Sequence, residues 1–258
     1  MDPIFCRTRH DYGSYVDFWR LVEAAKFPTC FVDEIDPDSN RTYVFTPLNG
    51  EWRGLGKRRA KIIWWNLERP QDDTLDGSLE RVAGTVDEIW VSDRWYASRD
   101  PRFKYVQIAG HPDFATRTTE RNWDICPLAY LWGRRKDAIS VLESKGYKIT
   151  PGAWGRSDQD KFVATSRLML NLHQYAGLNT VAPIRFAIAA SYAIPIVSEP
   201  FNDVVANELV IATVAIERLP IMIDRIFDQQ GRLAEMGQEL HHKLCIETDF
   251  RREIERKL

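Results

Sequence analysis

The sequence predicts an α/β protein with two Rossmann-like lobes that face each other across a central cleft, followed by C-terminal helices. Three observations support this class. Short apolar runs alternate with amphipathic helical stretches along most of the chain. Some runs, such as KIIWW at residues 61–65, are uniformly apolar, as is typical of parallel strands covered on both faces. A polar stretch at residues 111–124 separates two strand-helix series. The alternative is one continuous sheet with a helical tail.

The first half of the chain contains most of the expected strands and two helices. Apolar residues at Val16, Trp19 and Val22 form a helical stripe after Ser14, a good N-cap. A second helix is expected near residues 76–84. Crossover helices of this kind join parallel strands. The expected strands are residues 4–6, 30–32, 43–46, 61–67, 88–92 and 105–109.

The second half continues the alternation and then becomes helical. A strand begins at Ile125 and leads to a helix at residues 134–144 and a strand near residues 147–150. Residues 168–199 then predict a buried strand, a turn rich in Gly and Asn, a helix and a second buried strand. Helices are expected over residues 217–231 and from residue 232 to the end. The expected division is 1–115 for the first lobe, 116–235 for the second and 236–258 for a C-terminal helix.

Composition excludes several classes of protein. Apolar residues make up 44% of the 258 residues and charged residues 28%, so the whole chain is expected to fold. The 35 basic residues nearly balance the 37 acidic ones, which excludes a global positive field. The scattered Cys and His residues show no zinc spacing, and the cysteines are expected to be reduced core thiols. Since neither a signal peptide nor a membrane-length apolar run is found, a cytoplasmic protein is expected.

Polar residues follow predicted strands of the first lobe, at the edge where open α/β sheets collect ligands. His10 and Asp11 lie between the first strand and the first helix, where either side chain could take a proton from an acceptor hydroxyl. Gly13 lets a substrate approach the backbone, and Asn49 and Glu68 follow later strands. These residues predict an acceptor pocket. The alternatives are that Asp11 only caps the helix, and that Asn49 and Glu68 are ordinary turn or surface residues.

The second lobe carries a predicted anion site. Gly133 ends a strand, and Arg134 is the first of several basic residues at the start of the next helix. Positive charge at this end of a helix is disfavoured by the helix dipole, so the pattern makes better sense if a phosphate shares the site. A solvated basic turn is the alternative. The helix expected to begin near Thr180 offers the amides of Thr180, Val181 and Ala182 as a diphosphate cradle.

Further polar residues lie on the strands beside this cradle. Asn171 and His173 are two apart on one strand and share a face. Ser198 and Glu199 close the next strand, where a carboxylate can accept hydrogen bonds from ribose hydroxyls. A lone His is more often a satisfied core residue, and a strand-end carboxylate is often only a surface charge. The sequence contains neither a GxGxxG loop nor a P-loop.

A basic loop, KRRAK at residues 57–61, combines Arg58 and Arg59 with the preceding Trp52. Cations and an aromatic ring in one loop are a candidate contact for a polyanion such as DNA. A solvated surface loop is the alternative.

Several motifs resemble a known family. The segments LAYLWGRRKDAISVLESKGY, SRLMLNLHQY and APIRFAIAASYAIPIVSE are similar to the donor lobe of GT-B glycosyltransferases, close to bacterial and phage families with an NxH strand followed by an ExxR helix. The segments VDEIWVSDRWY and YVQIAGHPDF are similar to the acceptor lobe and linker. The resemblance implies sugar transfer from a nucleotide diphosphate sugar such as a UDP-sugar, without a cofactor or an essential metal.

The resemblance also implies roles for individual residues. Gly133 and Arg134 would contact the phosphates, the helix start at Thr180 would hold the diphosphate, and Glu199 would approach the ribose or sugar. Arg185 matches the helix Arg, but Ala182 stands where the family often has Glu three residues earlier. The final helices resemble a segment that crosses back to the first lobe, and 258 residues is short for this fold.

The sequence therefore predicts a nucleotide-sugar-dependent glycosyltransferase. The second lobe binds the donor, and the first lobe presents an acceptor hydroxyl to Asp11 or His10, which favours inversion. A modified base in phage DNA, a small molecule and a cell-surface glycan are open as acceptors. One alternative is a non-catalytic nucleotide- or nucleic-acid-binding module, which Ala182 favours. Another is a metal-dependent GT-A transferase that uses the DxD pattern of Asp36 and Asp38.

Overall fold

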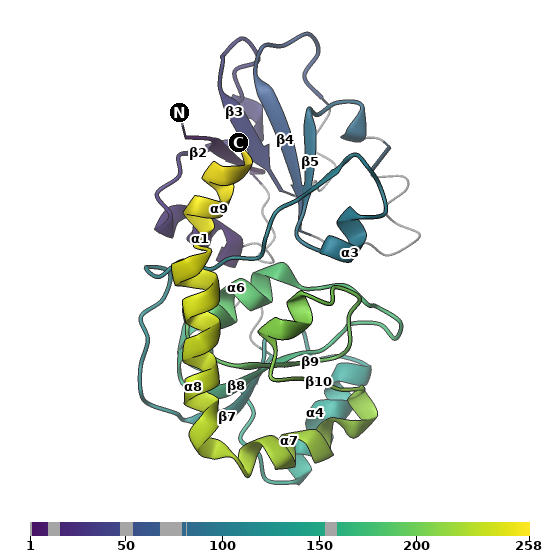
Figure 1. Cartoon of the computed structure of the whole chain (residues 1–258), viewed down its shortest axis with the longest axis vertical. Helices are drawn as coiled ribbons and strands as arrows, with labels where there is room; N and C mark the ends of the chain where they lie inside the picture. The colour runs from purple at the N-terminus through teal and green to yellow at the C-terminus, as the bar shows by residue number, and fades with distance from the viewer. Residues whose placement is uncertain (1, 10–15, 47–53, 68–78, 81, 153–158) are drawn as a thin grey trace.

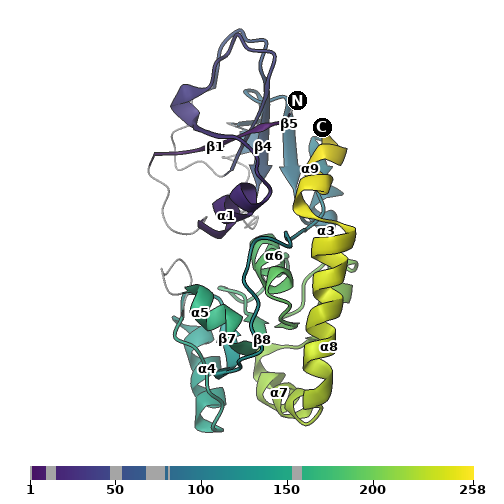
Figure 2. The ribbon, with the colours of Figure 1, turned by 90° about the vertical axis from the view of Figure 1, so that its left-hand side faces the viewer.

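A computed structural model describes residues 2–9, 16–46, 54–67, 79–80, 82–152 and 159–258. Two parallel β-sheets form separate lobes, with the first lobe above the second in Figure 1. The C-terminal helices run along one side of the molecule from the second lobe to the first, as Figure 2 also shows. The prediction of two Rossmann-like lobes is confirmed, and the single continuous sheet is wrong. Among the described residues, every helix is too short or too polar to cross a bilayer.

The sheet of the first lobe has the strand order β2-β1-β3-β4-β5-β6, and all its pairings are parallel. In the middle of the sheet, Ile63 pairs with Val44 on one side and Glu88 on the other. Because both faces of this strand are covered, its four central residues, 62–65, are all apolar. The elements are β1 (Ile4–Arg7), α1 (Val16–Ala24), β2 (Thr29–Phe31), η2 (Val32–Glu34), β3 (Thr42–Phe45), β4 (Lys61–Asn66), β5 (Glu88–Val91), α3 (Arg94–Ala97) and β6 (Phe103–Tyr105).

The sheet of the second lobe has the order β10-β9-β8-β7 and is also parallel. The strand expected near residues 147–150 is reduced to one bridge between Ile125 and Ile149, because Pro151 has no amide hydrogen to extend the ladder. The elements are β7 (Trp123–Pro127), α4 (Arg134–Ser144), α5 (Gln159–Ala164), β8 (Ser166–Asn171), α6 (Pro183–Ser191), β9 (Ile196–Ser198), η3 (Ala206–Leu209), β10 (Ala212–Thr213), η4 (Ile216–Arg218) and α7 (Leu219–Phe227).

Helix α6 begins three residues later than the sequence pattern predicted. Pro183 occupies the first turn, where its missing amide hydrogen costs nothing. The residue before a proline is steered away from helical geometry, and Ala182 is the N-cap with φ −104° and ψ 84°. Thr180, Val181 and Ala182 therefore precede the helix instead of forming its first turn.

The chain crosses between the lobes twice, and the two crossings touch at Gly110. The Gly110 amide donates to the Leu244 carbonyl at 2.9 Å, and the Phe250 amide donates to the Gly110 carbonyl at 2.8 Å. A Cβ atom at Gly110 would lie 2.6 Å from Cys245 Sγ. Only glycine fits this close approach of two backbones.

The C-terminal segment is not one helix. It consists of α8 (Gln230–His241), a wider π-helical stretch, η5 (His242–Glu247), and α9 (Phe250–Lys257). Asp249 has a positive φ of 52° and caps α9 by accepting a hydrogen bond from the Arg252 amide at 3.0 Å. This break redirects the chain toward the first lobe.

Helix α9 completes the core of the first lobe. The Phe250 ring stacks on Trp65 with 5.8 Å between centroids and packs edge-on against Phe18 at 6.1 Å. Arg251 bonds to Asp2 at 2.8 Å, so the two ends of the chain lie side by side (Figure 1). The last helix therefore belongs to the packing of the lobe that begins the chain.

Candidate functional site

The carboxyl ends of the strands in the two lobes face each other. Because each sheet is parallel, polar residues that follow its strands gather at one edge. Asp93 follows β5 in the first lobe, and Val181 precedes α6 in the second. The Val181 amide donates to Asp93 Oδ2 at 3.1 Å, so the two edges are in direct contact. This interface is the candidate site.

Three residues predicted for donor binding meet at the edge of the second lobe. Arg134 donates to Glu199 through two nitrogens, at 2.9 and 2.7 Å, and to the His173 carbonyl at 3.2 Å. The His173 amide donates to Glu199 Oε2 at 2.6 Å. The Glu199 side chain is 7% exposed and that of Arg134 26%. An arginine and a carboxylate joined by two parallel hydrogen bonds form one of the stronger kinds of ion pair. Arg134, which was predicted to bind a phosphate, and Glu199, which was predicted to bind the ribose, are thus hydrogen-bonded to each other.

A second polar group lies below this pair. Arg185 donates to Asn171 Oδ1 at 2.9 Å and to the Leu172 carbonyl at 3.1 Å. Asn171 Nδ2 donates to Ser198 Oγ at 2.8 Å. All three side chains are buried. Their hydrogen bonds join α6, β8 and β9, so Asn171, Arg185 and Ser198 hold the edge in place beneath the more exposed pair.

The predicted diphosphate cradle is closed by a carboxylate. Thr180, Val181 and Ala182 are buried, and Asp93 takes the amide of Val181. Among the described residues, no group hydrogen-bonds the Thr180 hydroxyl. A cavity of about 10 Å³ lies between Asp93, Thr180 and Pro183, which is room for about one water molecule. Burial raises the pKa of Asp93, although hydrogen bonds from the Tyr96 and Val181 amides oppose the rise.

Five residues predicted for the acceptor side lie outside the described residues. They are His10, Asp11, Gly13, Asn49 and Glu68. Gly133 is described: it has a φ of 53° and is the N-cap of α4, which brings Arg134 to the edge.

The basic loop lies at the opposite edge of the first sheet. Arg58 and Arg59 precede β4, and a loop before a parallel strand lies away from the strand's carboxyl end. Arg58 bonds to Asp87 at 3.1 Å, and its side chain is only 15% exposed. Asp36 and Asp38 lie in the turn before β3, at the same far edge. The structure thus places both arginines, which were predicted for the acceptor site, away from the edge at which the two lobes meet. No metal-ligating cluster of three or more residues is found in the described part of the chain.

Sequence reasoning missed two carboxylates at the interface, Asp93 and Asp203. Asp203 Oδ2 accepts a hydrogen bond from the Arg94 amide at 2.8 Å, from the second lobe to the first. Asp93 could have been found, because it follows a predicted strand just as Asn49 and Glu68 do. Asp203 lies in a loop that carries no comparable signal.

An exposed aromatic pair beside Arg134 was also missed. The rings of Trp132 and Tyr175 meet edge to face, with 6.0 Å between centroids. Trp132 is 48% exposed and Tyr175 45%, and the nearby Tyr130 is 52% exposed. Exposed rings at the ligand edge of a sheet are suited to stack on the planar face of a base.

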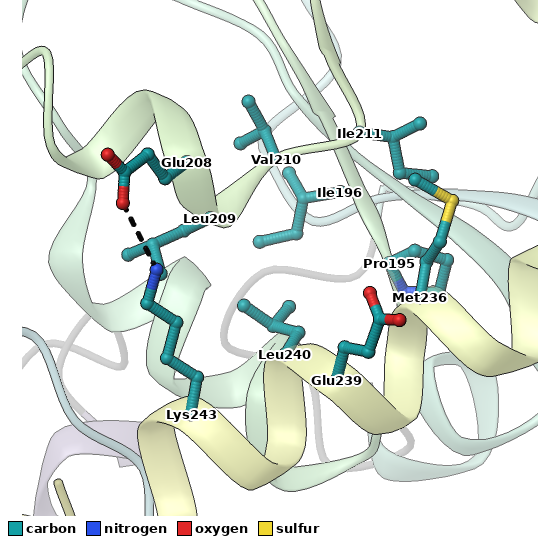
Figure 3. Close-up of a pocket in the computed structure, with 10 residues that line it drawn as sticks. All are labelled: Pro195, Ile196, Glu208, Leu209, Val210, Ile211, Met236, Glu239, Leu240 and Lys243. Carbon is teal, nitrogen blue, oxygen red and sulfur yellow. Dashed lines mark hydrogen bonds and ion pairs between the residues drawn. The ribbon is translucent and has the colours of Figure 1, made fainter. Parts of the chain in front are cut away.

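A larger cavity of about 230 Å³ lies elsewhere in the second lobe (Figure 3). It includes Ile196, where β9 begins, so it lies at the amino ends of the strands, away from the interface. Glu208 pairs with Lys243 at 3.3 Å, and Glu239 adds a second carboxylate to otherwise largely apolar walls. Two carboxylates against one cation do not suit a diphosphate.

No family model and no curated protein matches the chain. Two solved structures of TarM are similar in fold. One is a mutant of the S. aureus protein in complex with Fondaparinux, alpha-GlcNAc-glycerol and UDP, with 9% identity over 88% of this chain and 56% of that chain, and a TM-score of 0.58. The other has 10% identity over 88% and 55% of the two chains and a TM-score of 0.54.

This likeness establishes the fold. TarM is a glycosyltransferase with the GT-B fold, and the present chain has the same two-lobed GT-B architecture. The GT-A alternative is therefore wrong. The chain spans only about 55–56% of the length of these two TarM chains.

Proposed function

We propose that this protein binds a nucleotide diphosphate sugar between its lobes and transfers the sugar to an acceptor hydroxyl. The observation that carries the proposal is the start of α6. There a buried Thr180 hydroxyl, which has no hydrogen-bond partner among the described residues, lies next to a backbone amide that already binds a carboxylate. The amino terminus of a nine-residue helix favours an anion at this point. In a GT-B fold this point lies between the lobes.

Arg134 and Glu199 supply the next contacts in this proposal. A guanidinium has five N–H donors, and the three hydrogen bonds described above leave two of them for a phosphate. A carboxylate likewise has more acceptor positions than Arg134 and His173 fill, so Glu199 can still accept from a ribose hydroxyl. The positive charge of Arg134 would stabilise the leaving diphosphate without requiring a metal.

The aromatic pair supplies a platform for the base of the donor. Trp132 lies two residues before Arg134, and Tyr175 lies two residues after His173, so both rings flank the polar pair. Stacking of a base on an aromatic ring contributes about 1–3 kcal/mol. We therefore expect Trp132→Ala to weaken the binding of UDP.

The first lobe provides the acceptor side and the general base in this proposal. His10 and Asp11 remain the proposed bases on sequence grounds, since they follow β1 in the sequence and a residue after a parallel strand is expected at the carboxyl edge of its sheet. Arg58 and Arg59 lie at the far edge and give no support to DNA as the acceptor. The acceptor is therefore proposed only as a hydroxyl compound.

Replacement of Thr180 by Val tests the site. Removing a buried hydroxyl without a partner should leave stability unchanged or slightly higher, because no hydrogen bond is lost. It should weaken UDP binding by roughly tenfold or more, since a hydrogen bond to a charged phosphate is worth about 1.5–3 kcal/mol. Calorimetry measures binding, and Thr150→Val, at a buried position whose amide bonds to Ile125 in the middle of β7, is the matched control.

Activity is measured with a panel of radiolabelled nucleotide sugars and hydroxyl acceptors. Hydrolysis or transfer by the natural sequence, reduced in Thr180→Val, supports the proposal. Binding of UDP with neither hydrolysis nor transfer supports the non-catalytic module instead. Unchanged UDP affinity in Thr180→Val contradicts the proposed location of the diphosphate.

A further inference from the structure

Asp93 connects the two lobes through backbone amides. Its Oδ1 accepts from the Tyr96 amide at 2.9 Å and so caps α3 within the first lobe. Its Oδ2 accepts from the Val181 amide at 3.1 Å, just before α6 in the second lobe. The side chain thus holds a short helix in its own lobe and lies at the helix start of the other.

Asp203 makes the reciprocal connection. It binds the Arg94 amide of the first lobe at 2.8 Å, and its other oxygen accepts from the Ala206 amide at 3.0 Å. Both aspartates are buried. The charge of Asp203 adds to the burial that raises the pKa of Asp93. Each lobe therefore places a carboxylate on the backbone of the other, but only Asp93 lies at the α6 start.

We propose that Asp93 is an autoinhibitory occupant of the diphosphate position, so that a donor binds only when this carboxylate leaves the Val181 amide. The inference rests on the proposed function. A carboxylate and a phosphate are both anions and accept the same N–H group, so they compete for it. With Asp93 in place, the cavity of about 10 Å³ beside Thr180 has room for about one water molecule, which is smaller than a phosphate.

Displacement of Asp93 breaks one of the two reciprocal connections between the lobes. Donor binding is then coupled to loosening of this contact, while the Asp203 connection to Arg94 remains. The donor has to displace Asp93 from the Val181 amide, and the free energy spent on this displacement lowers the apparent affinity for the donor.

Two substitutions of Asp93 test the inference. Asp93→Ser is a good N-cap for α3, but it is neutral and shorter, so it vacates the diphosphate position. Asp93→Asn keeps the size and the cap while removing the charge. The matched control is Asp203→Asn, which weakens the reciprocal connection without vacating the start of α6.

The measurement is calorimetric affinity for UDP and for inorganic pyrophosphate, with urea unfolding curves to show that each variant folds. Asp93→Ser should bind both probes roughly tenfold more tightly or better than the natural sequence, because a hydrogen bond to a charged group no longer has to be displaced. Asp93→Asn should show a smaller gain. Asp203→Asn should stay within about twofold of the natural sequence, since it leaves Asp93 in place.

Equal or weaker binding in both Asp93 variants overturns the inference, as does an equal gain in Asp203→Asn, which would show a general clamp between the lobes. If Asp93→Ser does not fold, Asp93→Asn decides by the same criterion. Tighter pyrophosphate binding without sugar transfer by any variant keeps the inference and rejects the proposed function. Transfer by the natural sequence with unchanged affinity in the Asp93 variants rejects the inference alone.

Discussion

The two lobes share one architecture but bury different chemistry. Behind its ligand edge the first lobe packs aromatic rings, whereas the second lobe buries hydrogen-bonded polar side chains at that edge. Burial of aromatic rings stabilises the folded protein, but the rings have few hydrogen-bonding groups to offer a ligand. A polar group can exchange one hydrogen-bond partner for another. The rings are Phe5, Phe18, Trp65, Trp90 and Phe250, and the polar side chains are Asn171, Arg185, Ser198 and Glu199.

The first lobe, unlike the second, depends for its packing on the end of the chain. Phe250 lies on α9, yet it contacts rings from α1, β1 and β4. The second lobe holds its polar edge with residues from β8, α6 and β9. Stability of the first lobe and chemistry of the second can therefore be separated by substitution.

Removal of the Phe250 ring should have the largest effect. Phe250→Ala is expected to lower the free energy of unfolding by about 3–5 kcal/mol, because it leaves a cavity among packed rings. Urea unfolding followed by tryptophan fluorescence measures the loss. Ile246→Ala, at a side chain that is 42% exposed, is the control and should change stability by less than about 0.5 kcal/mol. Similar losses in the two variants would show that α9 is not part of the core.

Removal of the Glu199 carboxylate should have the next largest effect. Glu199→Ala leaves the His173 amide and the Arg134 guanidinium without this partner and should destabilise the protein by about 2–3 kcal/mol. Glu199→Gln keeps an acceptor for the amide and should lose less. Thermal or urea unfolding measures both, with the exposed Glu235→Ala as control. Equal effects of Glu199→Ala and Glu235→Ala would mean that the polar edge adds no stability.

Crowding of the two crossings at Gly110 should have an intermediate effect. Gly110→Ala places a Cβ 2.6 Å from Cys245 Sγ and should cost about 1–3 kcal/mol. The double variant Gly110→Ala/Cys245→Ala removes the sulfur and should recover part of the loss, while the Ala187 carbonyl at 2.9 Å remains. A double-mutant cycle of unfolding free energies measures this coupling. Additive losses would contradict the close contact.

The pH dependence of stability should show the smallest effect. Asp17 of α1 accepts from Gln159 of the second lobe at 2.6 Å, and burial raises the pKa of Asp17. The folded protein then binds this proton more tightly than the unfolded chain does. The stabilising contribution is full below 3.8, the pKa of a free aspartate, and is lost as pH rises through the higher folded value.

Urea unfolding of the natural sequence and Asp17→Asn across this range measures the slope. The variant should lose stability less steeply as pH rises, because it lacks the titrating group. Asp38→Asn, in an exposed turn, should leave the slope unchanged. Parallel curves for the natural sequence and Asp17→Asn would contradict the raised pKa.

Local pattern determined the elements of the fold. Uniformly apolar runs and helical stripes predicted the parallel strands and their separation into two lobes, and helix α4 begins and ends where the sequence indicated, at Arg134 and Ser144. The same logic placed Arg134, His173 and Glu199 at one edge, because strand ends of a parallel sheet lie together. Pro183 indicates the later start of α6, because the residue before a proline is steered away from helical geometry.

Only the tertiary structure decided which polar groups bind each other. Asp93 meets the Val181 amide across 88 positions of sequence, and Arg134 meets Glu199 across 65. The aromatic contact of Phe250 also depends on how the lobes are built and joined. The far-edge position of Arg58 and Arg59, in contrast, follows from their place before a strand that the sequence predicts. A sequence pattern reports the face on which a residue lies, because that face depends on neighbours a few positions away. The partner of a buried charge depends on the packing of the whole chain, which no local period encodes.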